Sequence, residues 1–516
     1  MRQIYGLITC LTLTGLARTG AEKVEGVASR PQVDLLKQAV QTFAATNTPA
    51  GWAREIRFDR EGAAPVAARW TFVVADLTAC VALELEKPLR ADEWRLNGTR
   101  VPVPLEGMRY THIPAIPAAL LRTGTNVLEG TWTVDVRKGQ DTFDPPAAYL
   151  PARLLALTAA DLEFQTGPVL GCAGADYFTV ACRTRLPAAV TLDAGGLKQT
   201  SPAGLMHVFR LTGLKSATPY AYTLTASLGA VTRTLGPFTT RTLPDHEPFT
   251  FAALGDSRTN PDAWAKVAAA VAAAAPAFTL FGGDMVVDGR VDQHWDEQFF
   301  GVAKAFCATL PCFYVQGNHE GNSPLFYRLI PTPGGATNWT QAVGPVLIIG
   351  INGELNWSDK GPNLPWLEGV LVASRAKYIF METHYPAWTS GTHGALQAGA
   401  PRERPVREAQ QFILPLLKKY HATAMFAGHD HLYERSEPPD GVTVIITGGA
   451  GAPLYQKVAE AEKQNPYSKA FASRLHYCLV SVTAEHCRLR ALTPEGEELD
   501  TREWSPRDGV EGSKQP

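Results

Sequence analysis

The most constraining feature of this chain is a set of five short apolar runs, each followed within four residues by a side chain that can bind metal ions. Each run is bounded and has the length of a buried strand. The runs occupy residues 251–254, 278–281, 312–315, 378–381 and 424–427. The blocks that follow them read GDSR, GGD, GNHE, THYP and GHDH. We therefore expect carboxylate, amide and imidazole groups at the ends of strands.

Strand ends matter because open α/β sheets bind ligands outside the carboxyl ends of their strands, where several loops converge. Two neighbouring cations need a bridging carboxylate, further carboxylate and imidazole ligands, and room for a water molecule. The five blocks supply all of these groups. The pattern predicts a two-metal site.

The five blocks, in this order, resemble the calcineurin-like metallophosphoesterase family, and HDHLYER from residue 429 and GNHE from residue 317 look most like its purple acid phosphatase branch. The resemblance covers roughly the second half of the chain. It implies an α/β (α+β) fold in which a double-sheet sandwich is flanked by helices. Asn260 and Pro261 fit this alternation, because they form an N-cap and first-turn pair for an Ala-rich helix through Ala275.

The resemblance also implies a ligand set. Asp284 would bridge both metal ions, the first ion would also take Asp256 and His431, and the second would take Asn318, His384 and His429. If GHDH is locally extended, its two histidines project to one side and Asp430 to the other. Gly428 lets the backbone approach the ions closely.

One position departs from the family pattern. Most members carry D-x-H in the first block, but the third position here is Arg258. Purple acid phosphatases have a tyrosine three residues after the bridging aspartate, and that position is Val287. We therefore expect no tyrosinate-to-iron colour and a weakly held first metal. Alternatively, Arg258 clamps a phosphate oxygen, or it forms a salt bridge with a neighbouring acid.

Two further histidines resemble outer-sphere residues of the purple acid phosphatases: His393, nine residues after His384, and His319, directly after Asn318. Either could protonate the leaving alkoxide, because imidazole titrates near neutral pH. An exposed loop histidine is the alternative interpretation of His393. Six other histidines are interpreted as surface or packing residues: His207, His246, His294, His421, His476 and His486.

The resemblance implies an acid phosphatase-like hydrolase of small phosphate esters that uses a metal-bound hydroxide and two divalent or trivalent ions such as Fe, Mn or Zn. Two alternatives keep the same fold: a phosphodiesterase or nucleotidase, and a non-catalytic binding or adhesion protein whose first metal site is degenerate. Metal content and the hydrolysis of an aryl phosphate would separate the enzyme from the binding protein.

Length and charge set the frame for this site. A chain of 516 residues should hold two to four domains. The net charge of −2 argues against electrostatic capture of nucleic acid. After the N-terminus, no apolar run approaches the ~20 residues that span a bilayer.

Two β domains are expected in the N-terminal region, before the catalytic half. Residues 1–21 resemble a short export signal, which predicts a periplasmic or secreted protein, with a cytoplasmic one as the alternative. Residues 30–145 resemble a galactose-binding-like jelly roll with a carbohydrate contact, and residues 160–243 resemble a fibronectin type III sandwich. A Pro- and Ala-rich linker begins at residue 144, the phosphoesterase domain spans 247–495, and 505–516 is a disordered tail.

Cysteine usage is compatible with export. Three sequence-local couples could form disulfides: Cys172 with Cys182, Cys307 with Cys312, and Cys478 with Cys487.

Overall fold

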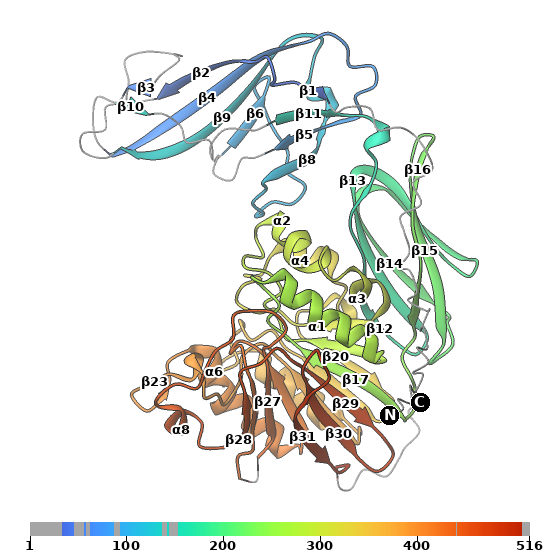
Figure 1. Ribbon diagram of the computed structural model, residues 1–516, viewed down its shortest axis with the longest axis vertical. Helices are drawn as coiled ribbons and strands as arrows, with labels where there is room; N and C mark the ends of the chain where they lie inside the picture. The colour runs from blue at the N-terminus through green and yellow to red at the C-terminus, as the bar shows by residue number, and fades with distance from the viewer. Residues whose placement is uncertain are drawn as a thin grey trace, which may run out of the picture.

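The computed structural model describes residues 33–45, 56–57, 62–86, 93–136, 142–143, 153–439 and 441–507. Along the chain these residues form an N-terminal pair of sheets, a second β region and a mixed α/β half (Figure 1). The expected export signal and most of the expected disordered tail lie outside the described residues.

The N-terminal region contains two main antiparallel sheets and a two-stranded ribbon. The first sheet has the order β1 (Val33–Asp34), β11 (Arg153–Leu157), β5 (Ala82–Glu86), β8 (His112–Pro117). The second has the order β2 (Val40–Ala45), β4 (Gly62–Val74), β9 (Gly124–Val136), β6 (Glu93–Leu96), β7 (Thr99–Arg100). The ribbon joins β10 (Thr142–Phe143) to β3 (Ile56–Arg57). Trp70 of β4 and Leu83 of β5 belong to one buried core, so the two main sheets pack together.

The strand β11 lies within the stretch that was expected to be a linker, because its Pro- and Ala-rich surroundings are typical of one. It nevertheless pairs with β5 and β1, and its residues Leu154 and Leu157 lie in buried cores. The first β region therefore receives a strand from beyond residue 145.

The second β region is hydrogen-bonded as one five-stranded sheet. Its order is β12 (Phe164–Ala173), β13 (Tyr177–Ala194), β15 (Pro219–Leu228), β16 (Val231–Arg241), with β14 (Leu197–Thr212) also paired to β13. The pairing of β13 with β14 is irregular between Arg183 and Ala188, where β13 passes from β12 to β15 as its partner. The jelly-roll and fibronectin type III assignments of the two β regions stay predictions.

The α/β half has two large sheets. One has the order β19 (Cys312–Tyr314), β18 (Phe278–Phe281), β17 (Phe249–Leu254), β29 (Tyr477–Val482), β30 (Cys487–Leu492), β31 (Glu498–Trp504). The other has the order β20 (Trp339–Val343), β21 (Val346–Gly350), β22 (Tyr378–Glu382), β25 (Ala424–Ala427), β27 (Thr443–Thr447), β26 (Tyr433–Ser436), β28 (Ser468–Ala472). The ring of Phe251 lies 5.4 Å from that of Phe380 and 6.3 Å from that of Phe426, so the sheets pack face to face.

Helices cover the outer faces of this sandwich. The α-helices of this half are α1 (Pro261–Ala274), α2 (Asp292–His294), α3 (Lys304–Thr309), α4 (Pro324–Leu329), α5 (Asn363–Ala373), α6 (Arg404–Glu408), α7 (Leu414–Lys419) and α8 (Ala461–Gln464), and β23 (Leu396–Gln397) and β24 (Ala400–Pro401) form a small ribbon. Trp264 of α1 packs on Phe281 of β18. On the other sheet, Leu367 of α5 and Leu417 of α7 share a core with Met425 of β25. The predicted double-sheet sandwich flanked by helices is confirmed.

The helix predicted after Asn260 is also confirmed. The side chain of Asn260 accepts a hydrogen bond from the backbone N–H of Ala263 at 3.2 Å, and Pro261 begins α1. Among the helices of the described residues, none has the length and apolar character needed to cross a bilayer.

Both β regions contact the segment that follows β18. The backbone N–H of Asp292 donates to the carbonyl of Arg109 at 2.9 Å, and Nη1 of Arg183 lies 2.5 Å from Oδ1 of Asp292. Because this segment continues from the loop of Asp284, the β regions help to fix one side of the candidate site.

The seven cysteines within the described residues are all free thiols. The three sequence-local couples therefore do not form disulfides in this structure.

Candidate metal centre

All five strands predicted from the apolar runs are present, and their carboxyl ends bring the expected ligand residues together. Two runs match strands residue for residue, β18 and β25, and the other three overlap β17, β19 and β22. Directly after these strands come Asp256, Asp284, Asn318, His384 and His429. Three of them have left-handed backbones, with φ of 61° at Asp256, 54° at Asp284 and 71° at His429. Such backbones cost energy and cluster at functional sites.

The second ligand group converges on Nε2 of His384. This nitrogen lies 3.0 Å from Oδ1 of Asn318, 3.1 Å from Nδ1 of His429 and 3.4 Å from Oδ1 of Asp284. Atoms that bind one cation at ~2.0–2.2 Å have separations of this size. The geometry therefore joins all four residues expected at the second ion.

The protonation of these imidazoles follows from their other nitrogen atoms. Nδ1 of His384 lies 2.8 Å from the carbonyl oxygen of Gly282, and Nε2 of His429 lies 2.8 Å from Oε2 of Glu403. A carbonyl or carboxylate oxygen only accepts, so these nitrogens carry the protons. Burial also lowers the pKa of His384, and it lowers the pKa of His429 to about 3. Both imidazoles are neutral at pH 7.

The lone pairs of Nε2 of His384 and Nδ1 of His429 thus point at each other, with the carbonyl oxygen of Asn318 beside them. Acceptors facing acceptors repel unless a cation lies between them. The donor set therefore fits a metal ion at this position.

The first ligand group consists of Asp256, Asp284 and His431, whose ligand atoms all lie within 4.8 Å of one another. Nε2 of His431 is 3.6 Å from Oδ1 of Asp256, and Nδ1 donates to the carbonyl oxygen of Pro453 at 2.8 Å. Burial lowers the pKa of His431 to about 4. Burial and the neighbouring Asp284 raise the pKa of Asp256 well above its usual value. A buried pair of carboxylates of this kind favours a bound cation.

Two glycines leave room for the carboxylates. A Cβ atom on Gly428 would overlap Oδ2 of Asp256, and one on Gly317 would overlap Oδ1 of Asp284. The close approach expected for Gly428 is therefore present, and Gly317 has the same role in the third block.

The GHDH segment is not locally extended, so the condition under which its two histidines would project to one side is not met. His429 is left-handed, and the backbone N–H of Asp430 bonds to the carbonyl of Gly428 at 2.9 Å, so the chain turns. The turn sends His429 to the second ligand group and His431 to the first. Asp430 does point away from both, and Oδ2 of Asp430 accepts the hydroxyl of Thr389 at 2.5 Å.

Arg258 lies beside the first ligand group. Its Nε is 3.3 Å from Oδ2 of Asp284, and its Nη2 is 3.3 Å from Nε2 of His431. This contact matches the salt-bridge alternative, and the acid involved is the expected bridging aspartate. Val287, at the position of the family tyrosine, is 37% exposed and has no ligand atom in its side chain.

The two outer-sphere histidines border different ligand residues of the site. Nε2 of His319 is 3.7 Å from Oδ2 of Asp284, while its Nδ1 lies 2.6 Å from the carbonyl oxygen of Val287. The ring of His393 lies 3.7 Å from the ring of His429, and its side chain is only 24% exposed. His393 is thus packed against a ligand. The six histidines assigned to surface or packing roles lie outside both ligand groups.

Sequence reasoning missed two carboxylates. Glu320 accepts three backbone N–H groups, from Asp284 at 2.8 Å, Met285 at 2.8 Å and Gly317 at 2.7 Å, and so ties the second block to the third. Burial and the charge of Asp284 raise its pKa to about 8. The sequence feature that could have indicated Glu320 is its position as the last residue of the GNHE block. Glu403 bonds both His429 and His393, and no local pattern marks it.

Comparisons with known proteins agree with this geometry. Residues 249–433 match the sequence profile of the calcineurin-like phosphoesterases. Tartrate-resistant acid phosphatase type 5 of Oryctolagus cuniculus is 33% identical over a match covering 33% of this chain and 58% of that protein. The Homo sapiens protein of the same name is 29% identical, with 22% of this chain and 30% of that protein covered. The matches thus span less than two thirds of these relatives.

Among solved structures, purple acid phosphatase PPD1 from yellow lupin (Lupinus luteus) matches 90% of this chain and 96% of its own, with a TM-score of 0.60 and 13% identity. A structure of PhoD matches 66% of this chain and 90% of its own, with a TM-score of 0.50 and 14% identity. These two matches show a shared fold.

The expected ligand residues at the strand ends of the double-sheet sandwich all lie within the residues that match the calcineurin-like phosphoesterase profile. The similarity to tartrate-resistant acid phosphatase type 5 is one of sequence, and the similarity to purple acid phosphatase PPD1 is one of fold.

Proposed function

We propose that this protein hydrolyses phosphate esters at a centre that binds two cations, in the manner of an acid phosphatase. The single observation that carries the proposal is the convergence of four acceptor atoms, from Asp284, Asn318, His384 and His429, with no donor among them. Asp256 and His431 provide the ligands of the adjoining first site.

Cations bound there supply Lewis acidity and lower the pKa of a coordinated water molecule. The chain's own residues orient the ester and control protons. Asp284 lies in both ligand groups and so keeps the two sites adjacent. The left-handed backbones and the glycine contacts hold the carboxylates in place before substrate arrives, which favours an electrostatically preorganised site.

Two side chains are placed to handle the leaving group. His393 is the better candidate for the acid that protonates the alkoxide. Although burial opposes its charge, the neighbouring Glu403 raises the pKa of His393. His319 lies on the other side of Asp284 and would contact a phosphate oxygen or the leaving group.

Arg258 has a dual role in this proposal. Its guanidinium is always charged, so it weakens cation binding at the first site and pairs bidentately with a phosphate oxygen when substrate is present. The two ions are divalent or trivalent, such as Fe, Mn or Zn. Because Val287 offers no phenolate, no tyrosinate-to-iron colour is expected.

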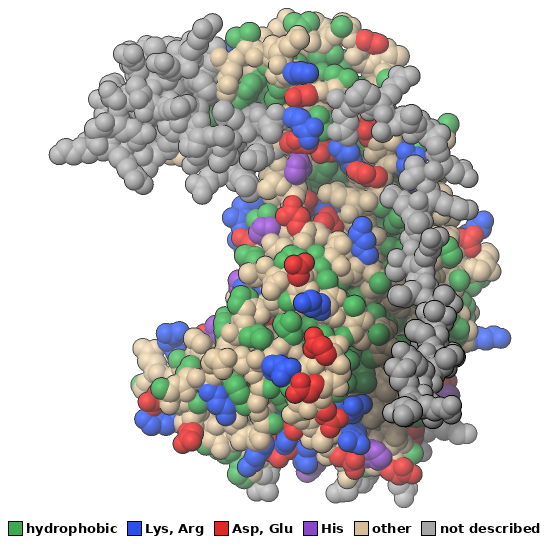
Figure 2. All heavy atoms as spheres, in the orientation of Figure 1, with side chains coloured by type: hydrophobic (Ala, Val, Ile, Leu, Met, Phe, Trp, Pro, Cys, Tyr) green, Lys and Arg blue, Asp and Glu red, His purple; other side chains and the backbone are tan. Residues whose placement is uncertain are grey.

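A small phosphate monoester is the proposed substrate, with phosphodiesters or nucleotides as alternatives. On the face shown in Figure 2, acidic and basic side chains of the described residues are interspersed, as the net charge of −2 suggests. Such a surface does not favour nucleic acid as the partner. Export to the periplasm or the medium, and a carbohydrate contact in the N-terminal region, stay proposals.

Elemental analysis of the purified protein, together with assays on p-nitrophenyl phosphate and bis(p-nitrophenyl) phosphate, tests this function. We expect bound transition metal, faster hydrolysis of the monoester, and loss of turnover after chelation that added metal restores. The variant His429→Ala should lose both metal and turnover. The matched control His246→Ala, whose side chain is 76% exposed, should lose neither.

The contact of Arg258 with Asp284 and His431 favours one rival, the binding protein with a degenerate first site. Near-zero metal content and no hydrolysis of either ester would support that rival and end the enzyme proposal.

A further inference from the structure

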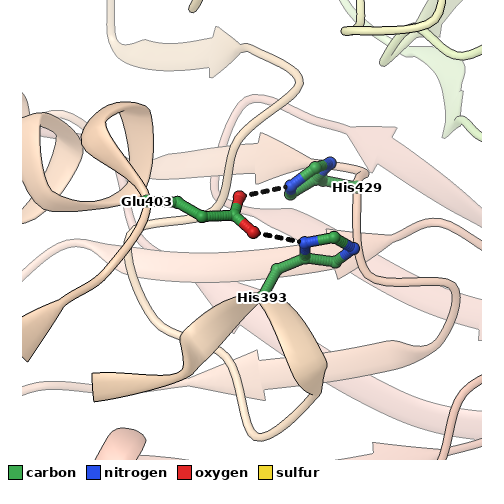
Figure 3. A group of neighbouring side chains, drawn as sticks. All are labelled: His393, Glu403 and His429. Carbon is green, nitrogen blue, oxygen red and sulfur yellow. Dashed lines mark hydrogen bonds and ion pairs between the residues drawn. The ribbon is translucent and has the colours of Figure 1, made fainter. Parts of the chain in front are cut away.

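One carboxylate connects the second ligand group to the candidate acid. Oε2 of Glu403 accepts from Nε2 of His429 at 2.8 Å, and Oε1 accepts from Nδ1 of His393 at 2.7 Å (Figure 3). Glu403 stands immediately before α6, and its side chain is 24% exposed. Each of its oxygens therefore holds one imidazole.

The bond to His429 determines which nitrogen faces the metal position. A neutral imidazole has one N–H and one lone pair. Since Nε2 donates to Glu403, the lone pair is on Nδ1, which lies 3.1 Å from Nε2 of His384. In the other tautomer the N–H of Nδ1 would point into the second site and block a cation. Carboxylates that fix a metal-binding imidazole in this way raise its basicity as a ligand.

The bond to His393 fixes the second imidazole on the first. The rings of His393 and His429 lie 3.7 Å apart and 37° from parallel. The backbone N–H of His393 also bonds to Oδ1 of Asp430 at 3.4 Å. Glu403 thus sets the orientation of His393 relative to a residue of the metal centre, and not merely to its own loop.

Glu403, His393 and His429 also have ligand atoms close enough together to hold a cation of their own. Such an ion would need the lone pair of Nε2 of His429, while the second site needs that of Nδ1. One neutral imidazole cannot supply both. The geometry therefore favours Glu403 as a hydrogen-bond acceptor over a ligand of a third ion.

We propose that Glu403 is a positioning residue that sets the tautomer of His429 for metal binding and, with its other oxygen, aligns His393 for catalysis. The part of the inference that concerns catalysis rests on the proposed function. The part that concerns metal binding rests on the geometry alone.

The main test is Glu403→Gln, because glutamine has the same length but carries an NH2 donor where one of the two accepting oxygens stood, so each imidazole no longer has its own acceptor. We expect its Zn²⁺ affinity at the tighter site, measured by competition with a chromophoric chelator, to fall roughly 10- to 100-fold. We also expect kcat to fall more than KM rises. The control is Glu408→Gln at the end of α6, the helix that Glu403 precedes. The carboxylate of Glu408 accepts the backbone N–H of Trp357, and this variant should keep the Zn²⁺ affinity of the wild type.

His393→Ala separates the two halves of the inference. It leaves the bond between Glu403 and His429 in place, so the Zn²⁺ affinity should stay near that of the wild type while kcat falls. Equal losses of Zn²⁺ affinity in His393→Ala and Glu403→Gln would contradict the proposed division of roles.

A measurement on the unaltered protein keeps the inference testable if Glu403→Gln does not fold. In metal-free, [¹⁵N]histidine-labelled protein, imidazole ¹⁵N shifts should show His429 protonated at Nε2. Protonation at Nδ1 would overturn the inference. The inference would also be overturned if the wild type were active and the Glu403→Gln variant bound Zn²⁺ as tightly as the wild type. If the wild type itself neither bound metal nor hydrolysed ester, the proposed function would fail instead.

Discussion

Nε of Arg258 lies 3.3 Å from Oδ2 of Asp284, so a permanent positive charge contacts the carboxylate expected to bridge two metal ions. Nη2 of the same guanidinium lies 3.3 Å from Nε2 of His431. Arg258 is therefore placed to compete with a cation at the first site. The second ligand group uses the other oxygen of Asp284, Oδ1, which lies 3.4 Å from Nε2 of His384.

Replacing Arg258 by histidine should raise the metal content from about one towards two ions per chain, because the change removes the charge and adds a ligand. Arg258→Ala should keep the second ion and weaken phosphate binding by roughly 10- to 100-fold, the effect of losing a hydrogen bond from a charged group. Metal analysis and inhibition by inorganic phosphate measure these outcomes. Arg490→Ala, on β30, is the control, and identical phosphate inhibition in Arg258→Ala and wild type would refute the clamp.

Gly428→Ala should reduce turnover by at least roughly tenfold, because a methyl group would displace the carboxylate of Asp256 and small misplacements in a site are costly. The matched control is Gly369→Ala in α5, where an added methyl group meets nothing within 4 Å. That change should leave turnover intact and raise stability by up to ~1 kcal/mol. Steady-state kinetics and thermal unfolding report on both, and a fully active Gly428→Ala would show that Asp256 is not constrained as described.

Arg183→Met should destabilise the protein by roughly 3–5 kcal/mol, because it leaves buried Asp292 without its partner. The side chain of Arg183 is 3% exposed and that of Asp292 is 0% exposed. The pair joins β13 to α2. The second β region and the α/β half should therefore separate at a lower urea concentration in the variant than in the wild type. Adding Asp292→Asn should recover part of the loss, and an unchanged unfolding curve for Arg183→Met would count against a structural role for the pair.

His476 should make the protein acid-labile. Burial lowers the pKa of His476 to about 4, whereas an unfolded histidine titrates near 6.5. The neutral form is favoured in the folded state, so this stabilisation is complete above pH ~6.5 and is lost as pH falls from 6.5 towards 4. The loss amounts to roughly 2 kcal/mol at pH 5.

His476→Phe removes that titration and also the buried Nε2, which lacks a hydrogen-bond partner. The melting temperature of the variant, relative to that of the wild type, should therefore rise as the pH falls from 7 to 5. A difference that stays constant over this range would show that His476 is not the titrating group.

Much of the site follows from the sequence because the apolar runs that form its strands are recognisable from neighbouring residues. The runs at residues 278–281 and 424–427 have the same bounds as β18 and β25, and the ligand residues follow within three residues. By contrast, the turn of GHDH was not predicted, because a left-handed His429 depends on the bonds of its backbone N–H to the Asp256 carboxylate. The strand β11 was missed for a similar reason, since its partners β1 and β5 are distant in the chain.

The sequence by itself predicted the apolar strand runs and the metal-binding residue types after them, because these are properties of neighbouring positions. Its resemblance to the metallophosphoesterase family implied the double-sheet class and the six ligands. Only the tertiary structure decided that Glu403 holds both His429 and His393, and that Arg258 touches Asp284. Those contacts join loops whose conformations depend on packing between distant segments, and no local pattern encodes such packing.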